Sequence, residues 1–232
     1  MKDIENQRAV RSFVRRSGRM TEAQTRAMRE LWPQFGIACT DAVLDLLELF
    51  GRDAPRVLEI GFGNGETLVD QARGDPRSDF IGVEVHEPGI GHCLLHIESS
   101  GITNLRLIAQ DALVILERQI ADRSLSRINL YFADPWPKKR HHKRRIVNAG
   151  FLELCASKLQ DRGCLHIATD WAGYAEHIDE LIGHTRQFKL IERREHCGDR
   201  PLERPTTKFE RRGLKRGHSI VDWKLGRIQA AL

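Results

Sequence analysis

Three glycines follow a short apolar run and are spaced for close contact with a bound molecule. Glu59 is followed by Gly61, Gly63 and Gly65 in the pattern E-x-G-x-G-x-G. Glycine lets the backbone approach a ligand closely, and a turn after a strand is where α/β sheets bind ligands. A dinucleotide fingerprint needs its third glycine one position later, where this chain has Glu66, whose charge is unfavourable beside a pyrophosphate. The turn therefore favours a ligand without phosphates at this point.

Two further acids stand at the ends of the next apolar runs. Glu84 ends FIGVE and Asp111 follows LRLIAQ. An acid in the position of Glu84 can accept hydrogen bonds from the ribose hydroxyls of a nucleoside. Each acid also has a simpler interpretation: a helix-capping acid for Glu59, a solvated strand end for Glu84, and a helix N-cap for Asp111. Because all three stand at successive strand ends beside a glycine turn, we favour a nucleoside-binding site.

The fourth apolar run ends in Asp134, Pro135, Trp136 and Pro137. A polar side chain and an aromatic ring next to rigid prolines could orient a planar base. Trp136 could instead be a core aromatic, and we favour the stacking role. The adjoining KKRHHKRR, at 138–145, contains no acid and could pair with phosphates. This region therefore has the features of an acceptor site for a nucleic-acid base.

A pair of histidines outside these motifs has the spacing of metal ligands. His92 and His96 are four residues apart and would share one face of a helix. The sequence shows no third ligand beside them. We therefore interpret both as solvated helix surface and expect no metal.

The elements that must position these residues alternate between short apolar runs and helical segments. Because the intervening segments are long enough for crossover helices, the order is typical of βαβ units. Continuous apolar runs are expected for strands that are buried on both faces. We expect an α/β, Rossmann-like fold with a mostly parallel seven-stranded sheet and helices on both faces. Its strands are VLEIG, FIGVEV, LRLIAQD, INLYFADP, CLHIATD and two late candidates at 188–192 and 218–223.

The N-terminal segment differs from the rest of the chain in composition. Residues 1–36 are rich in arginine and poor in apolar periodicity, so we expect a partly disordered basic arm that contacts the partner. A single domain should then occupy 37–232. Within it, the apolar spacing from Ile37 to Phe50 predicts a helix that ends at Gly51.

Composition limits the possible classes of protein. The 37 Lys and Arg outnumber the 32 Asp and Glu, giving a net charge of +5 that favours a polyanionic partner. The five cysteines include no C-x-x-C pair, so neither a disulfide framework nor a zinc site is indicated. No apolar run is long enough for a membrane span, and no secretory signal is evident. We expect a cytoplasmic protein without membrane contact.

The run ADPWPKKRHHKRRI resembles the hallmark of the bacterial tRNA (guanine-N7-)-methyltransferase family. The resemblance extends from RMTEAQ and WPQFG, through the glycine turn and IATDW, to RPTTKFERRG and GHSIVDWK, but not to the first nineteen residues. The glycine turn itself resembles the first motif of class I methyltransferases. The resemblance implies that fold, and methyl transfer from S-adenosyl-L-methionine to N7 of the guanine at position 46, in the variable loop of tRNA. It implies no obligatory protein partner, and monomer and homodimer both stay open.

The resemblance also assigns roles to single residues. Asp134 is implied as the catalytic residue and as a cofactor contact. Glu59 is implied near the ammonium group of the cofactor, Asp111 near the adenine amine, and Glu84 and the three glycines as further contacts. Substrate contacts are implied at Lys138, Asp170, Thr207, Lys208, Phe209 and Glu210. RNA contacts are implied at Arg140, His141, His142, Lys143, Arg144 and Arg145.

Guanine offers hydrogen-bond donors at N1 and the 2-amino group, which a carboxylate can read while N7 stays free. Asp170 and Glu210 are the candidates for this role. The alternatives are a helix N-cap for Asp170 and a solvated ion pair for Glu210 with one of its basic neighbours, Lys208, Arg211 and Arg212.

Three other classes of protein agree less well with these residues: a methyltransferase for small molecules or proteins, a nicotinamide-dependent oxidoreductase, and a nucleic-acid binding protein without activity. The first would not need the basic loop beside its acceptor site, and the second needs the pyrophosphate turn that Glu66 disrupts. The third has no reason to keep three acids around a cofactor pocket.

Overall fold

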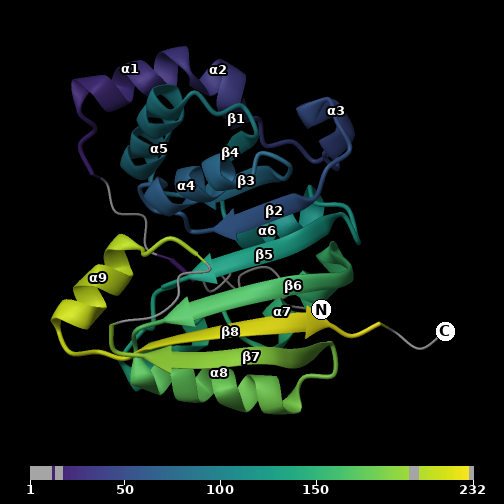
Figure 1. The fold of residues 1–232 in the computed structure, drawn as a ribbon, viewed down its shortest axis with the longest axis vertical. Helices are drawn as coiled ribbons and strands as arrows, with labels where there is room; N and C mark the ends of the chain where they lie inside the picture. The colour runs from purple at the N-terminus through teal and green to yellow at the C-terminus, as the bar shows by residue number, and fades with distance from the viewer. Residues whose placement is uncertain (1–11, 14–17, 199–203, 230–232) are drawn as a thin grey trace, which may run out of the picture.

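The computed structural model describes residues 12–13, 18–198 and 204–229, which form one mixed sheet covered by helices (Figure 1). The sheet order is β1-β4-β3-β2-β5-β6-β8-β7. The strands from β1 to β6 pair in parallel, while β8 is antiparallel to both β6 and β7. The bounds are β1 (Gly36–Ile37), β2 (Arg56–Ile60), β3 (Asp79–Glu84), β4 (Leu105–Ala109), β5 (Leu125–Tyr131), β6 (Leu159–Thr169), β7 (Phe188–His196) and β8 (Ile220–Arg227).

Helices connect the strands and cover both faces of the sheet. The helices are α1 (Glu22–Glu30), α2 (Trp32–Phe35), α3 (Leu46–Phe50), α4 (Glu66–Gly74), α5 (Glu87–Ser100), α6 (Ala112–Arg118), α7 (Ala149–Lys158), α8 (Ala172–His184), α9 (Lys208–Lys215) and a 3-10 helix, η1 (Lys139–Arg144). The apolar faces of α1, α4 and α5 join one core cluster, and those of α6, α7 and α8 join the other. The layered α/β fold expected from the sequence is thereby confirmed.

Side chains along a strand point alternately to the two faces of the sheet, so one strand can contribute to both core clusters. In β2, Val57 belongs to the cluster under α4 and α5, whereas Leu58 and Ile60 belong to the cluster under α6 and α7. Both sets are buried because helices cover both faces, which explains why the strands read as continuous apolar runs. All seven expected strands are observed, with ends that differ by a few residues, and β1 adds an eighth strand in the described residues.

The helix expected from Ile37 to Phe50 is largely wrong. Ile37 instead pairs with Ile108 as an edge of the sheet, and only Leu46–Phe50 is helical. Asp45 begins that helix by accepting hydrogen bonds from the backbone N–H groups of its first turn. The expected stop at Gly51 is confirmed, with φ at 68°. Tertiary pairing with β4 therefore overrides the local apolar spacing at Ile37.

The expectation of a basic arm is wrong for the part that forms α1 and α2. Thr21 and Gln24 make a reciprocal capping box at the start of α1. Ala27 is fully buried against α5, and Arg26 bonds Glu98 of that helix through both carboxylate oxygens. These helices belong to the folded unit (Figure 1). The rest of the expected arm, apart from 12–13 and 18–21, lies outside the described residues.

All five cysteines lie in the described part of the chain and are free thiols. Among the described residues, no helix has the length and apolar character needed to cross a membrane.

Candidate active site

The residues singled out from the sequence gather at the carboxyl ends of the parallel strands. Gly61 follows β2, Glu84 ends β3, Asp111 follows β4, Asp134 follows β5 and Asp170 follows β6. The strand order reverses between β2 and β5, because β3 and β4 lie on one side of β2 and β5 and β6 on the other. Open α/β sheets bind their ligands at such a point. The topology therefore brings the predicted site residues to one edge of the sheet.

The glycine turn is held in shape by Glu84. Its Oε2 accepts a hydrogen bond from the Gly63 N–H at 2.9 Å, while its Oε1 accepts from the N–H groups of Val85 and His86. Glu84 is therefore not a solvated strand end. Gly61 and Gly63 have φ of 70° and 60°, in the region that favours glycine. A Cβ on Gly61 would meet nothing within 4 Å, so this side of the turn is open to a ligand.

Glu59 lies beneath the turn in a buried polar network. Its Oε2 accepts a hydrogen bond from Gln71 at 2.8 Å, and Gln71 in turn accepts one from Asn129. Burial raises the pKa of Glu59 to about 7, although the hydrogen bond from Gln71 opposes this shift. The alternative of a helix-capping acid is wrong, because the N-cap of α4 is Gly65 and no side chain caps that helix.

Asp111 caps α6. Its side chain accepts a hydrogen bond from the Leu113 N–H at 3.0 Å, so the simpler interpretation of this residue is confirmed. A carboxylate that caps a helix through one oxygen can accept a further hydrogen bond through the other. The cap and the expected adenine contact are therefore compatible.

The segment after β5 is sharply bent around Asp134. The exposed Asp134 carboxylate accepts a hydrogen bond from the Trp136 N–H at 3.0 Å. Trp136 has a φ of 46° and is buried, and its indole N–H donates to the carbonyl of Ser12. The Arg144 guanidinium lies 3.9 Å from the centroid of the indole ring. The stacking role expected for Trp136 is therefore wrong, because Arg144 already occupies a face of this buried ring.

The basic segment divides into exposed residues and one buried residue. Arg145 is 5% exposed, donates from Nε to the Pro135 carbonyl and lies over the ring of Tyr174. Burial lowers its pKa, as expected for a cation removed from water. Arg145 therefore supports the loop from inside, and its buried guanidinium does not face the surface where RNA would bind. The exposed members of the segment are Lys138, Lys139, Arg140 and Lys143.

The two histidines of this segment lie half-buried in η1. His142 contacts Arg145 through Nε2, at 3.2 Å from Nη2. Burial and then the charges of Arg140 and Arg144 lower the pKa of His141. His141 is therefore mainly neutral near pH 7 and adds little charge to the loop.

Helix α9 lies across the same edge of the sheet, where Figure 1 shows it beside the ends of β5 and β6. Thr207 is buried and caps it by accepting from the Glu210 N–H at 2.9 Å. Lys208 and Phe209 are exposed, and a Cβ on Gly63 would come within 3.8 Å of the Phe209 ring. The helix thus places an aromatic ring over the glycine turn.

Glu210 points away from solvent into a buried cluster of charges. Its side chain is 1% exposed, and its Oε2 lies 2.6 Å from Nη1 of Arg204. The same guanidinium donates from Nε and Nη2 to both carboxylate oxygens of Asp222. Burial opposes ionisation of Asp222, but hydrogen bonds from His166 and Arg204 outweigh it and hold the pKa of this carboxyl below its ordinary range. The solvated ion pair considered for Glu210 is therefore wrong.

Arg204 was missed in the sequence analysis. It is one of 37 basic residues, and nothing in its local sequence distinguishes it from a surface arginine. Its burial follows from the packing of α9 against β8, where its guanidinium lies between Glu210 and Asp222. Arg204 is the cation that joins the two elements.

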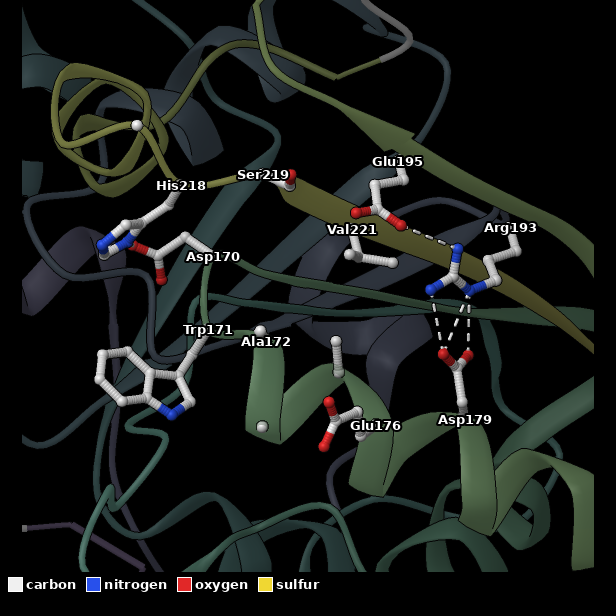
Figure 2. A pocket seen from close by; sticks show the side chains of 13 residues that line it. Asp170, Trp171, Ala172, Glu176, Asp179, Arg193, Glu195, His218, Ser219 and Val221 are labelled. Atoms are coloured by element: carbon white, nitrogen blue, oxygen red, sulfur yellow. Dashed lines mark hydrogen bonds and ion pairs between the residues drawn. The ribbon is translucent and has the colours of Figure 1, made fainter.

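Asp170 contacts α9 and borders a cavity (Figure 2). A Cβ on Gly213 would lie 2.8 Å from its Oδ2, so only glycine lets α9 approach this closely. Asp170 does not cap α8, because Trp171 is the N-cap and no side chain serves there. The cavity, of about 580 Å³, is lined by residues that include Asp170, Trp171, Glu176, Arg193 and His218. Figure 2 shows Asp170 beside His218 at one end and Arg193 bonded to Asp179 and Glu195 at the other.

Comparison with known proteins identifies the family. The family described as "Putative methyltransferase" matches residues 53–223. The tRNA (guanine-N(7)-)-methyltransferase of Halorhodospira halophila is 50% identical over 221 residues, which cover 93% of this chain and 94% of that protein. The enzyme of the same description from Alcanivorax borkumensis is 51% identical over 215 residues, covering 93% of this chain and 90% of that protein.

Solved structures share the fold at low sequence identity. The 16S rRNA methyltransferase KamB has a TM-score of 0.56 at 14% identity, covering 81% of this chain and 95% of that one. TrmN from Thermus thermophilus has a TM-score of 0.54 at 18% identity, covering 79% of this chain and 47% of that one. These similarities support the class I methyltransferase fold. On the sequence matches across most of its length, the chain belongs to the S-adenosylmethionine-dependent tRNA (guanine-N(7)-)-methyltransferase family.

Proposed function

We propose that this protein transfers a methyl group from S-adenosyl-L-methionine to N7 of the guanine at position 46, in the variable loop of tRNA, in the cytoplasm. The observation that carries this proposal is the meeting of three parts at one sheet edge. These are the open glycine turn held by Glu84, the exposed carboxylate of Asp134, and α9 with Phe209 above the turn.

The residues around the turn suit the proposed methyl donor. Glu84 would accept from the ribose, Asp111 would accept from the adenine amine through its second oxygen, and the turn from Gly61 to Gly65 would face the methionine part. Glu59 would act from beneath the turn: it would hold Gln71 in place through their hydrogen bond and keep the buried side of the pocket polar. When bound, S-adenosyl-L-methionine supplies an electrophilic methyl group on a positively charged sulfur. The absence of any phosphate in this ligand agrees with Glu66 directly after the turn.

We assign guanine recognition to Asp170 and the fixing of α9 to Glu210. The Asp170 side chain is 28% exposed, whereas that of Glu210 is 1% exposed and lies against Arg204. A carboxylate that reads N1–H and the 2-amino group has to be accessible to the base. Thr207 would act through the cap of α9, and Lys138, Lys208 and Phe209 are exposed and able to contact the nucleotide.

Asp134 would act through its charge and position. Guanine N7 carries no proton at neutral pH, so the transfer does not require a general base. Positive charge develops on the purine as N7 acquires the methyl group, and a nearby carboxylate stabilises it. The hydrogen bond from the Trp136 N–H fixes the direction of Asp134 while leaving its second oxygen able to face the base.

The exposed cations after Asp134 would bind the RNA backbone. Lys138, Arg140 and Lys143 extend from a short loop anchored by the buried Arg145. Each neutralised phosphate releases counterions, so these contacts would give salt-dependent affinity without sequence preference. The loop directly follows Asp134, which would bring the bound backbone next to the acceptor site.

The proposal is tested by single-turnover methylation of unmodified tRNA with Asp134→Asn. This change keeps the shape of the side chain and removes its charge. We expect the rate to fall by about tenfold to a thousandfold while tRNA affinity stays nearly unchanged, as for loss of a transition-state interaction. The matched control is Asp161→Asn, at an exposed carboxylate of β6 that bonds Arg227, which should keep the full rate. An undiminished rate in Asp134→Asn would contradict the assignment.

A further inference from the structure

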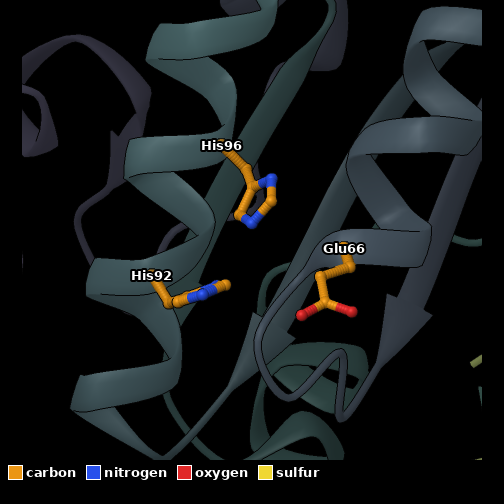
Figure 3. Close-up of side chains that lie close together, drawn as sticks. All are labelled: Glu66, His92 and His96. Atoms are coloured by element: carbon orange, nitrogen blue, oxygen red, sulfur yellow. The ribbon is translucent and has the colours of Figure 1, made fainter. Parts of the chain in front are cut away.

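Three side chains that the proposed reaction does not use converge beside the glycine turn (Figure 3). His92 and His96 lie one turn apart on α5, with ring centroids 4.7 Å apart. Glu66, the first residue of α4, points toward them from the neighbouring helix. One ligand atom from each of the three lies within 4.8 Å of the others, and all three residues are only half-buried. The sequence spacing showed the two histidines, and the fold adds the third potential ligand.

A backbone contact orients the ring of His92. Its Nδ1 lies 3.1 Å from the carbonyl oxygen of Asn64. Because a carbonyl can only accept a hydrogen bond, Nδ1 carries the proton when this bond forms, and the lone pair is left on Nε2. Ligating histidines are commonly oriented in this way by a carbonyl or carboxylate at the other ring nitrogen.

The set of donors selects a class of metal ion. Two imidazole nitrogens and one carboxylate suit zinc and neighbouring divalent transition metals, whereas calcium and magnesium prefer oxygen ligands throughout. At metal–nitrogen distances of about 2.1 Å, ligand atoms in a tetrahedral site lie about 3.4 Å apart. Rotation of partly exposed side chains can close the gap from 4.8 Å. Glu66 also lies 3.4 Å from Arg211 of α9, an exposed contact that a metal ion would have to compete with.

We propose that Glu66, His92 and His96 bind one divalent transition-metal ion of the zinc class, with water completing the coordination. The proposed methyl transfer gives none of these three side chains a role, although the site lies beside the glycine turn through the contact of His92 with Asn64.

The test is titration of the untagged full-length chain with ZnCl2 by calorimetry. Cys39 and Cys197 are exposed, and free thiols can also bind zinc, so both are replaced by serine in every sample. His96→Gln is the main variant, because its ring has no role in the turn, and Glu66→Gln is the second. The matched control is His184→Gln, which removes an exposed histidine from α8. Electron paramagnetic resonance with Cu2+ then counts the nitrogen ligands.

We expect one saturable zinc site in the parent chain. His96→Gln and Glu66→Gln should each weaken it by more than about tenfold, since loss of even an outer-shell partner costs about 10- to 100-fold. His184→Gln should leave the affinity unchanged, and the Cu2+ spectrum should show two nitrogen ligands that fall to one in His96→Gln. The absence of saturable binding, or equal affinity in the parent chain and His96→Gln, would overturn the proposal.

Discussion

Replacement of Arg204 by methionine should destabilise the fold more than any exposed charge change on α9. Arg204→Met keeps an unbranched side-chain stem but removes the guanidinium and with it three hydrogen bonds, of 2.6, 2.8 and 3.1 Å, to Glu210 and Asp222. The arginine side chain is 2% exposed and the carboxylates are 1% and 8% exposed, so water does not replace the lost cation. Breaking a buried ion pair in this way costs about 3 to 5 kcal/mol of unfolding free energy.

The assay is urea unfolding at pH 7, followed by circular dichroism, with hydrogen exchange of the α9 amides as the local measurement. The control is Arg211→Met, because Arg211 is 54% exposed and its contact with Glu66 is worth about 0 to 1 kcal/mol. Adding Glu210→Gln and Asp222→Asn to Arg204→Met should recover part of the loss, because these changes remove the buried negative charges. A cost for Arg204→Met no larger than that of the control would refute the reasoning.

Three further changes test the site itself. Glu84→Gln should weaken binding of S-adenosylhomocysteine by about 1 to 3 kcal/mol in calorimetry, while Glu87→Gln, at an exposed acid nearby, should not; equal affinities would contradict the role of Glu84. Glu59 binds a proton more tightly in the folded chain, with a pKa of about 7 against 4.5, so stability should fall by about 3 kcal/mol as pH rises from 4.5 to 7. Glu59→Gln should remove that component of the stability–pH curve, and an unchanged curve would argue against the raised pKa. Arg140→Ala with Lys143→Ala should flatten the slope of log affinity for tRNA against log salt by about 1 to 2, and an unaltered slope would place the loop away from the RNA.

Strands β2 to β5 were predictable because each is an apolar run that is largely buried on both faces. The glycine turn was also predictable, because Gly61, Gly63 and Gly65 adopt positive φ angles that favour glycine. The order of the acids at successive strand ends was sufficient to bring them to one edge, since parallel strands share that edge. Local patterns therefore predicted the part of the site that is built on the strands.

The errors arose where contacts in the folded chain, and not the local residue spacing, determine the structure. Ile37 has helical spacing with its neighbours, but pairing with β4 makes it a strand residue. Trp136 reads as an exposed stacking ring, yet the chain bends at a positive φ and buries it beneath Arg144. Glu210 reads as a surface acid among cations, but Arg204 binds it from the interior. None of these contacts follows from helical or strand periodicity.

The most direct test of the central claim is methylation of a tRNA transcript in which 7-deazaguanosine replaces guanosine. The substitution exchanges N7 for a carbon atom and leaves the N1 and 2-amino edge, so the recognition proposed for Asp170 is retained while the proposed acceptor atom is removed. With radiolabelled S-adenosyl-L-methionine, we predict full incorporation into the guanosine transcript, located at position 46, and none into the 7-deaza transcript, which should still bind and act as a competitive inhibitor. Equal incorporation into both transcripts would contradict methyl transfer to N7.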